Sequence, residues 1–132
     1  MLELFAKDVL ALKQDVKLLN QYIVPLTVER GLAMLMDKRR LSCEQIDYFL
    51  PHISSEYFRD KLAQGLERIG FPIPQEKWFT NLTTKGNTGA ASMHIMLEEL
   101  FNGGRLERGQ RILCFVPESG RFTTSFMLLT VV

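Results

Sequence analysis

The sequence predicts an α/β fold: a mixed sheet of about four strands, with helices on its faces and a long helical segment at the N-terminus. Helix-like and strand-like segments alternate in the order helix, strand, helix, strand, helix, strand, strand. Strands linked by helices run parallel in such folds. The last two strands are separated only by a short turn at residues 117–121. We therefore expect these two strands to be antiparallel.

Residues 2 to about 36 have the pattern of a helical segment. Its apolar residues recur every three or four positions and form one stripe: Leu2, Phe5, Val9, Leu12, Val16, Leu19, Ile23 and Leu26. Pro25 has no amide hydrogen, so we expect the helix to break or kink just before it. A second helical stretch then covers residues 26–36, and the basic residues 38–40 suit its C-terminal end. A coiled coil has little support, because the pattern ends at the proline after about three heptads.

Strands and helices alternate through the middle of the chain. Residues 46–50 form a mostly apolar strand, and residues 54–69 form the next helix. Residues 78–82 are predicted as a second strand. The following helix runs from about residue 88 to 102 and ends at two consecutive glycines. Two further strands, 112–116 and 122–132, complete the predicted sheet.

His52 is a candidate binding residue because it directly follows the strand 46–50 and Pro51. Ligands of open α/β sheets bind at the carboxyl ends of the strands. A histidine at this position is therefore a better candidate than one in the middle of a helix. A structural histidine with its hydrogen bonds satisfied remains the alternative.

The stretch Lys-Gly-Asn-Thr-Gly-Ala-Ala-Ser at residues 85–92 has the composition of a helix start. Asn87 and Thr88 are good helix N-cap types, since their side-chain oxygens can accept from free amides of the first turn. The small residues that follow allow another backbone or a ligand to approach closely. A capped helix that packs tightly is the simpler interpretation. A phosphate-binding loop has little support, because the second glycine and the lysine at P-loop spacing are missing.

The length of 132 residues predicts one domain, residues 1–132. The helical pattern makes 1–40 a helical lead-in, and the core that carries the motifs described below covers 41–132. The chain is 46% hydrophobic and 23% charged with a formal net charge of +1, so no global field indicates nucleic acid or a membrane. Cys43 and Cys114 have no metal-type spacing and are expected to be free thiols, so we expect no metal. No export signal or run of about 18 apolar residues is present, which predicts a cytoplasmic protein.

Two motifs together resemble the C-terminal half of a β-ketoacyl-[acyl carrier protein] synthase III, a thiolase-like condensing enzyme. The first is Asp-Tyr-Phe-Leu-Pro-His at residues 47–52, and the second is Gly-Asn-Thr-Gly-Ala-Ala-Ser at residues 86–92. Their order and separation make this resemblance specific. It covers residues 41–132 well and residues 1–40 weakly.

The resemblance implies a decarboxylating Claisen condensation of an acyl thioester with a malonyl thioester. It assigns His52 and Asn87 as catalytic donors to the thioester oxygen, and places Gly86, Thr88 and Gly120 in substrate binding. It implies no cofactor, because coenzyme A or the phosphopantetheine of an acyl carrier protein carries the substrate. A homodimer is also expected.

Departures from the family pattern qualify this expectation. The nucleophilic cysteine of the family has no counterpart in Cys43 or Cys114, so the chain resembles a fragment whose N-terminal half-domain is missing. The family's arginine for carrier-protein docking is not matched, although Arg59 lies nearby. Of the glycine-rich closing loop, only Gly120 clearly remains, so acyl preference is expected to differ, as in specialised lipid or polyketide synthases. A non-catalytic thiolase-like domain for assembly or binding is the alternative.

Overall fold

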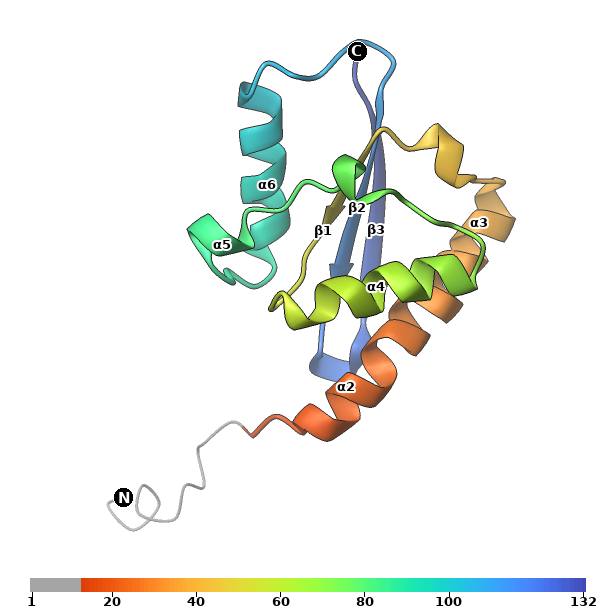
Figure 1. Ribbon diagram of the computed structural model, residues 1–132, viewed down its shortest axis with the longest axis vertical. Coiled ribbons are helices and arrows are strands. Elements are labelled where there is room, and N and C mark those ends of the chain that lie inside the picture. Colours follow the sequence, from red (N-terminus) through yellow and green to blue (C-terminus); the bar gives the residue numbers. More distant parts are fainter. Residues whose placement is uncertain (1–12) are drawn as a thin grey trace.

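The computed structural model describes residues 13–132 and arranges them as one sheet between two layers of helices (Figure 1). The sheet has three strands in the order β1-β2-β3. Strand β1 (Tyr48–Pro51) is parallel to β2 (Arg111–Pro117), and β2 is antiparallel to β3 (Thr124–Thr130). The predicted mixed sheet with an antiparallel last pair is therefore confirmed.

The predicted strand at residues 78–82 is wrong, and the sheet formed by residues 13–132 consequently has three strands rather than four. Trp78 forms only an isolated parallel bridge with Phe49. The backbone turns away soon afterwards, because the carbonyl of Asn81 accepts the amide of Lys85 at 2.8 Å. A four-residue helix, α5 (Leu82–Lys85), occupies the end of the predicted strand.

The N-terminal helical segment is continuous through three elements: α2 (Val16–Val24), η1 (Pro25–Leu32) and α3 (Ala33–Arg39). It begins at Val16 because Asp15 caps it, with Oδ1 accepting the amide of Leu18 at 2.9 Å. Residues 13–15 are not helical, contrary to the prediction. The part of the predicted stripe in residues 1–12 lies outside the described residues.

Pro25 changes the helix but does not end it. The eight residues Pro25–Leu32 are π-helical, and π-helical segments, although rare, occur mostly inside α-helices. The hydroxyl of Thr27 donates to the carbonyl of Ile23 at 2.5 Å and satisfies an acceptor beside the proline. The expected break is thus replaced by a local widening.

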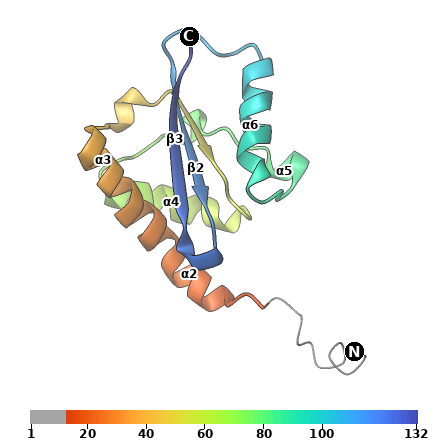
Figure 2. The ribbon, with the colours of Figure 1, turned by 180° about the vertical axis from the view of Figure 1, so that it is seen from behind.

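Helices cover both faces of the sheet, as predicted (Figures 1 and 2). The N-terminal segment and α4 (Tyr57–Arg68) lie on one face, and α6 (Ala91–Asn102) lies on the other. Gly70 and Gly104, which follow α4 and α6, have φ of 70° and 64°. Glycine takes this left-handed conformation without steric cost, which explains where both helices end. Single helical turns complete the connections: η2 (Cys43–Gln45), η3 (Gln75–Lys77) and η4 (Gly120–Phe122).

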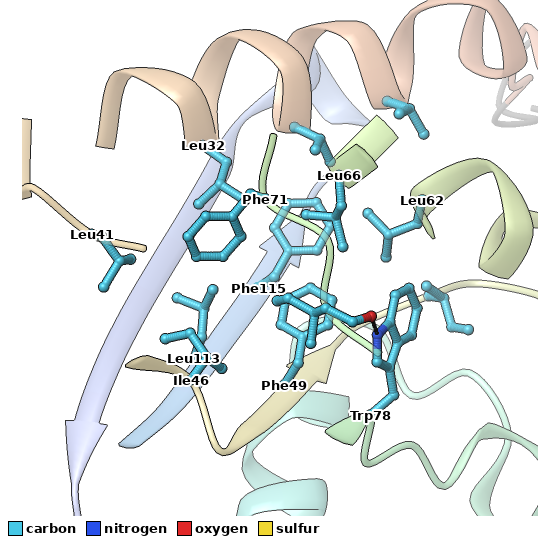
Figure 3. Close-up of a cluster of buried hydrophobic side chains, with 14 of the residues drawn as sticks. Leu32, Leu41, Ile46, Phe49, Leu62, Leu66, Phe71, Trp78, Leu113 and Phe115 are labelled. Atoms are coloured by element: carbon cyan, nitrogen blue, oxygen red, sulfur yellow. Dashed lines mark hydrogen bonds between the residues drawn. The ribbon is translucent and has the colours of Figure 1, made fainter. Parts of the chain in front are cut away.

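The side chains of β2 alternate between two apolar clusters. Leu113 and Phe115 join the cluster beneath the N-terminal segment and α4 (Figure 3), whereas Ile112 and Cys114 pack toward α6. Burying a side chain of this size stabilises the fold by about 1.5–3 kcal/mol. Within residues 13–132, no helix is long and apolar enough to cross a membrane.

Candidate active site

A pocket of about 260 Å³ lies at the carboxyl end of β1, between the N-terminal helical segment, the start of α4, the loop before α6 and the end of β2. Most of its wall is apolar. The residues that line it are Gln14, Leu19, Ile23, Val24, Thr27, His52, Ile53, Ser54, Phe58, Leu62, Asn87, Gly89, Phe115, Pro117, Glu118 and Ser119. The structure therefore brings His52 and Asn87 to one pocket.

Pairing of β1 with β2 determines the position of His52. Asp47 precedes β1, and its Oδ2 accepts the amide of Arg111 at 2.7 Å, while its own amide donates to the Arg111 carbonyl at 2.9 Å. At the other end, the amide of His52 donates to the carbonyl of Phe115 at 2.8 Å. Both ends of the Asp-Tyr-Phe-Leu-Pro-His motif are thus fixed to β2.

The imidazole of His52 is nearly enclosed, with 7% of the residue exposed. Burial lowers the pKa of His52, and the negative charge of Glu118 opposes this shift. The neutral form is therefore favoured, and a neutral imidazole can donate one N–H without carrying charge.

Asn87 lies at the exposed mouth of the pocket, before α6. Its Oδ1 accepts the amide of Gly89 at 2.9 Å. This bond uses the oxygen of the side chain and leaves the Nδ2 amide, which makes no hydrogen bond within the described part of the chain, able to donate to a ligand.

Asn87 and Thr88 do not cap α6 as predicted, because Gly89 adopts a φ of 61° and inserts a turn before the helix. The N-cap residue is Ala90, which has no capping side chain. The hydroxyl of Thr88 instead lies 2.8 Å from that of Ser92.

The three residues predicted for substrate binding have different locations. Gly86 has a φ of 74° and lines a small cavity of about 10 Å³ that also contacts His52. Thr88 lines neither cavity, since its hydroxyl is paired with Ser92. Gly120 also lines neither; it lies in an exposed turn, and the preceding residues Glu118 and Ser119 form the pocket wall instead.

Sequence reasoning missed Glu118 and the conformation of the loop that follows it. Arg121 and Phe122 both have positive φ, 60° and 49°, a conformation that non-glycine residues adopt at a cost. This loop delays the start of β3 to Thr124 and sets Glu118 against the pocket. The signal available in the sequence was a carboxylate in place of glycine in the closing loop.

Neither thiol belongs to the pocket. Burial raises the pKa of Cys114 to about 11, and burial followed by the neighbouring Glu44 raises the pKa of Cys43. Both effects disfavour the reactive thiolate. No cluster of three metal-ligating side chains occurs in residues 13–132.

The guanidinium of Arg59 is held by hydrogen bonds and an aromatic contact within the fold. It donates to Glu56 at 2.7 Å, Gln75 at 2.8 Å and Thr80 at 2.8 Å, and its guanidinium lies 5.7 Å from the ring centre of Trp78. A guanidinium held in this way braces α4 against the segment before α5, and it has little freedom to dock a partner.

Comparison with known proteins gives a consistent result. Residues 36–128 match the family described as 3-oxoacyl-[acyl-carrier-protein (ACP)] synthase III C terminal. A β-ketoacyl-[acyl-carrier-protein] synthase III from Clostridium perfringens is 35% identical over 86 residues, which cover 65% of this chain and 25% of that protein. The enzyme of the same name from Clostridium kluyveri is 27% identical over 128 residues, covering 97% of this chain and 37% of that one.

The same similarity holds for the fold. The crystal structure of a β-ketoacyl-[acyl carrier protein] synthase III from Thermus thermophilus superimposes with a TM-score of 0.73 and 25% identity, covering 91% of this chain and 35% of that one. The chain therefore spans about a quarter to somewhat over a third of the length of the proteins it resembles.

Proposed function

The chain belongs to the family of 3-oxoacyl-[acyl carrier protein] synthase III C-terminal domains, and from this membership we propose that it supplies the C-terminal catalytic half of a condensing acyltransferase. The reaction is a decarboxylative Claisen condensation between an acyl thioester and a malonyl thioester. The observation that carries the proposal is that His52 and Asn87 line one pocket at the carboxyl end of β1.

His52 and Asn87 act as the two donors to the oxygen of the malonyl thioester. Loss of carbon dioxide converts that thioester to an enolate, so negative charge develops on the oxygen only as the reaction proceeds. Donors that are already oriented stabilise the transition state more than the ground state. The lowered pKa of His52 supports this role, because the neutral imidazole donates a hydrogen bond without protonating the enolate.

The nucleophile comes from a half-domain outside this sequence. Cys114 packs toward α6 with its pKa raised to about 11, and Cys43 lies in the turn η2. Neither thiol lines the pocket that contains His52. A cysteine from the missing half would take the acyl group before the malonyl thioester enters.

The partners of this chain are then that half-domain, a second copy of the synthase, and coenzyme A or acyl carrier protein thioesters. Docking of the carrier uses residues other than Arg59, whose guanidinium is held by Glu56, Gln75 and Thr80.

Reconstitution tests the proposal. The chain is co-expressed with a synthase III N-terminal half that carries the nucleophile, and condensation of acetyl-coenzyme A with malonyl carrier protein is measured. We expect product from the pair and none from either half alone. The pair is repeated with the nucleophilic cysteine changed to serine as control. A stable complex without condensation would favour the alternative, a thiolase-like domain used for assembly or binding.

A further inference from the structure

His52 lines two separate cavities, the large pocket and a small cavity of about 10 Å³. Four of the residues that line the small cavity have polar side chains: His52, Thr80, Asn81 and Ser92. Apart from His52, none of these four lines the large pocket. A polar cavity of about 10 Å³ holds roughly one water molecule, which makes about three hydrogen bonds to its walls. The small cavity therefore has the size and polarity of a single-water site beside His52.

The side chain of Asn81 has a fixed orientation on this wall. Asn81 is buried, and its Nδ2 donates to Oε2 of Glu99 at 2.8 Å. The other oxygen of that carboxylate lies 3.3 Å from Nζ of Lys85. The bond from Asn81, followed by the nearby Lys85, lowers the pKa of Glu99. An ionised carboxylate only accepts hydrogen bonds, so Nδ2 of Asn81 must face Glu99 and Oδ1 must face away from it.

Oδ1 of Asn81 is an acceptor that the bond to Glu99 does not use. In residues 13–132, two buried side-chain oxygens lack a partner and are sealed from water, Glu118 Oε1 and Thr124 Oγ1. Neither Asn81 Oδ1 nor a ring nitrogen of His52 is among these sealed atoms. Water therefore reaches each of them that has no partner in the protein.

The two hydroxyl groups on the wall of the small cavity differ in what they offer. Oγ1 of Thr80 accepts a hydrogen bond from the Arg59 guanidinium at 2.8 Å, so the hydroxyl hydrogen of Thr80 remains available for donation. Oγ of Ser92 instead lies 2.8 Å from Oγ1 of Thr88 and accepts the Thr88 amide at 3.2 Å. The wall thus presents one free donor, Thr80, and one oriented acceptor, Asn81 Oδ1.

We propose that Asn81 is a positioning residue that acts on His52 through one water molecule in the small cavity. The water accepts from Thr80, donates one hydrogen to Asn81 Oδ1 and donates the other to the ring nitrogen of His52 that faces it. That nitrogen is then unprotonated, so the proton of the neutral imidazole is held on the other nitrogen, toward the large pocket. The inference rests on the proposed function, in which this N–H donates to the thioester oxygen.

The test measures the tautomer of His52 in the 132-residue chain, labelled with ¹⁵N-histidine, by NMR at about pH 8, where the imidazole is neutral. Long-range ¹H–¹⁵N correlation distinguishes a protonated from an unprotonated ring nitrogen. We expect one tautomer to predominate, and the carbon-bound ring protons to receive magnetisation from a long-lived water. In Asn81→Ala, the ratio of the tautomers should shift toward the other form by about two- to tenfold, which is the effect of one hydrogen bond.

Two further variants separate this contact from a general change. Asn102→Ala is the matched control, because Asn102 also donates from Nδ2 to a glutamate of α6, Glu98, but is exposed and lines neither cavity. It should leave the tautomer ratio of His52 unchanged. Glu99→Gln lets the Asn81 amide turn either way, because a glutamine amide both donates and accepts. It should shift the ratio in the same direction as Asn81→Ala, by a smaller factor.

Circular dichroism checks that the variants fold, and Glu99→Gln decides the question if Asn81→Ala does not. An unchanged tautomer ratio in the folded variants of Asn81 and Glu99, or an equal shift in Asn102→Ala, would overturn the inference. Absence of a long-lived water beside the His52 ring would overturn it as well.

Failure of the proposed function gives a different result, because the tautomer is measured without substrate. If the ratio shifts as expected but His52→Ala leaves decarboxylation by the reconstituted synthase at its normal rate, the proposed function is wrong and the role of Asn81 stands. If the ratio stays constant while His52→Ala slows decarboxylation, the role of Asn81 is wrong and the proposed function stands.

Discussion

The amide of His52 donates to the carbonyl of Phe115 at 2.8 Å, one residue beyond the paired part of β1. This bond extends the β1–β2 ladder to the pocket. Glu118 lies three residues further along the same segment from Phe115, so the histidine and the carboxylate are positioned by a common piece of backbone. Register between β1 and β2 therefore determines the geometry of the site.

Asp47→Ala tests this dependence on register. The substitution removes the carboxylate that accepts the Arg111 amide, and hydrogen bonds to charged groups contribute about 1.5–3 kcal/mol. We expect the free energy of unfolding in urea to fall by about 2 kcal/mol. Glu67→Ala, at an exposed position of α4, serves as control and should change it by less than about 0.5 kcal/mol. Equal effects of the two substitutions would show that the Asp47 bond does not stabilise the sheet.

Glu118→Gln should lower the pKa of His52 further. The carboxylate stabilises the imidazolium, so its removal leaves only the burial that disfavours the charged form. NMR titration of the imidazole signals measures the change directly. The second histidine, His94, is exposed on α6, does not line the pocket and serves as the internal control. A His52 pKa that stays constant or rises in the variant would contradict the proximity of the two groups.

Gly65→Ala should destabilise the fold although alanine is the better helix former. A Cβ at Gly65 would overlap Cγ1 of Val24, where α4 crosses α2. Overpacking typically costs about 1–3 kcal/mol, which outweighs the gain of about 1 kcal/mol in helix propensity. Gly31→Ala is the matched control: its nearest neighbours would lie at 3.5 Å, and urea unfolding should show equal or greater stability. Val24→Ala removes the side chain that the new Cβ would overlap. The double variant Gly65→Ala/Val24→Ala should therefore lose less free energy of unfolding than the sum of the losses in the two single variants.

Neither cysteine of this chain should accept an acyl group. At pH 8, a thiol with a pKa of about 11 is ionised in about one molecule in a thousand, and Cys114 is also buried. Incubation with acetyl-coenzyme A followed by peptide mass spectrometry should show no acetylated Cys43 or Cys114. Iodoacetamide should modify the buried Cys114 rapidly only after unfolding. Acetylation that Cys43→Ser or Cys114→Ser abolishes would contradict an external nucleophile.

Features determined by local pattern could be predicted from the sequence. The apolar runs predicted β1, β2 and β3. The helix-containing connections predicted the parallel pairing of β1 with β2, and the short turn predicted the antiparallel pairing of β2 with β3. His52 could be placed at a strand end because Pro51 closes the apolar run before it.

Features that depend on competition between neighbouring segments could not be predicted. Trp78 reads as a strand residue, but the turn at Asn81 prevents more than a single bridge. Pro25 favours a break, but packing against α4 and a Thr27 hydroxyl bond keep the helix continuous. Glu118 reaches the pocket wall because of the conformation of the β2–β3 loop. That conformation could not be predicted from the residue types in the loop.

The central claim is that His52 and Asn87 stabilise the enolate formed from the malonyl thioester. The most direct measurement is release of carbon dioxide from malonyl carrier protein by the reconstituted synthase, with acyl transfer from labelled acetyl-coenzyme A to the nucleophile measured in parallel. Removing one donor of this kind slows a reaction by about 10²–10³-fold. We predict that His52→Ala and Asn87→Ala each slow decarboxylation to this extent while acyl transfer stays within about twofold. Decarboxylation at the normal rate in both variants would contradict the claim.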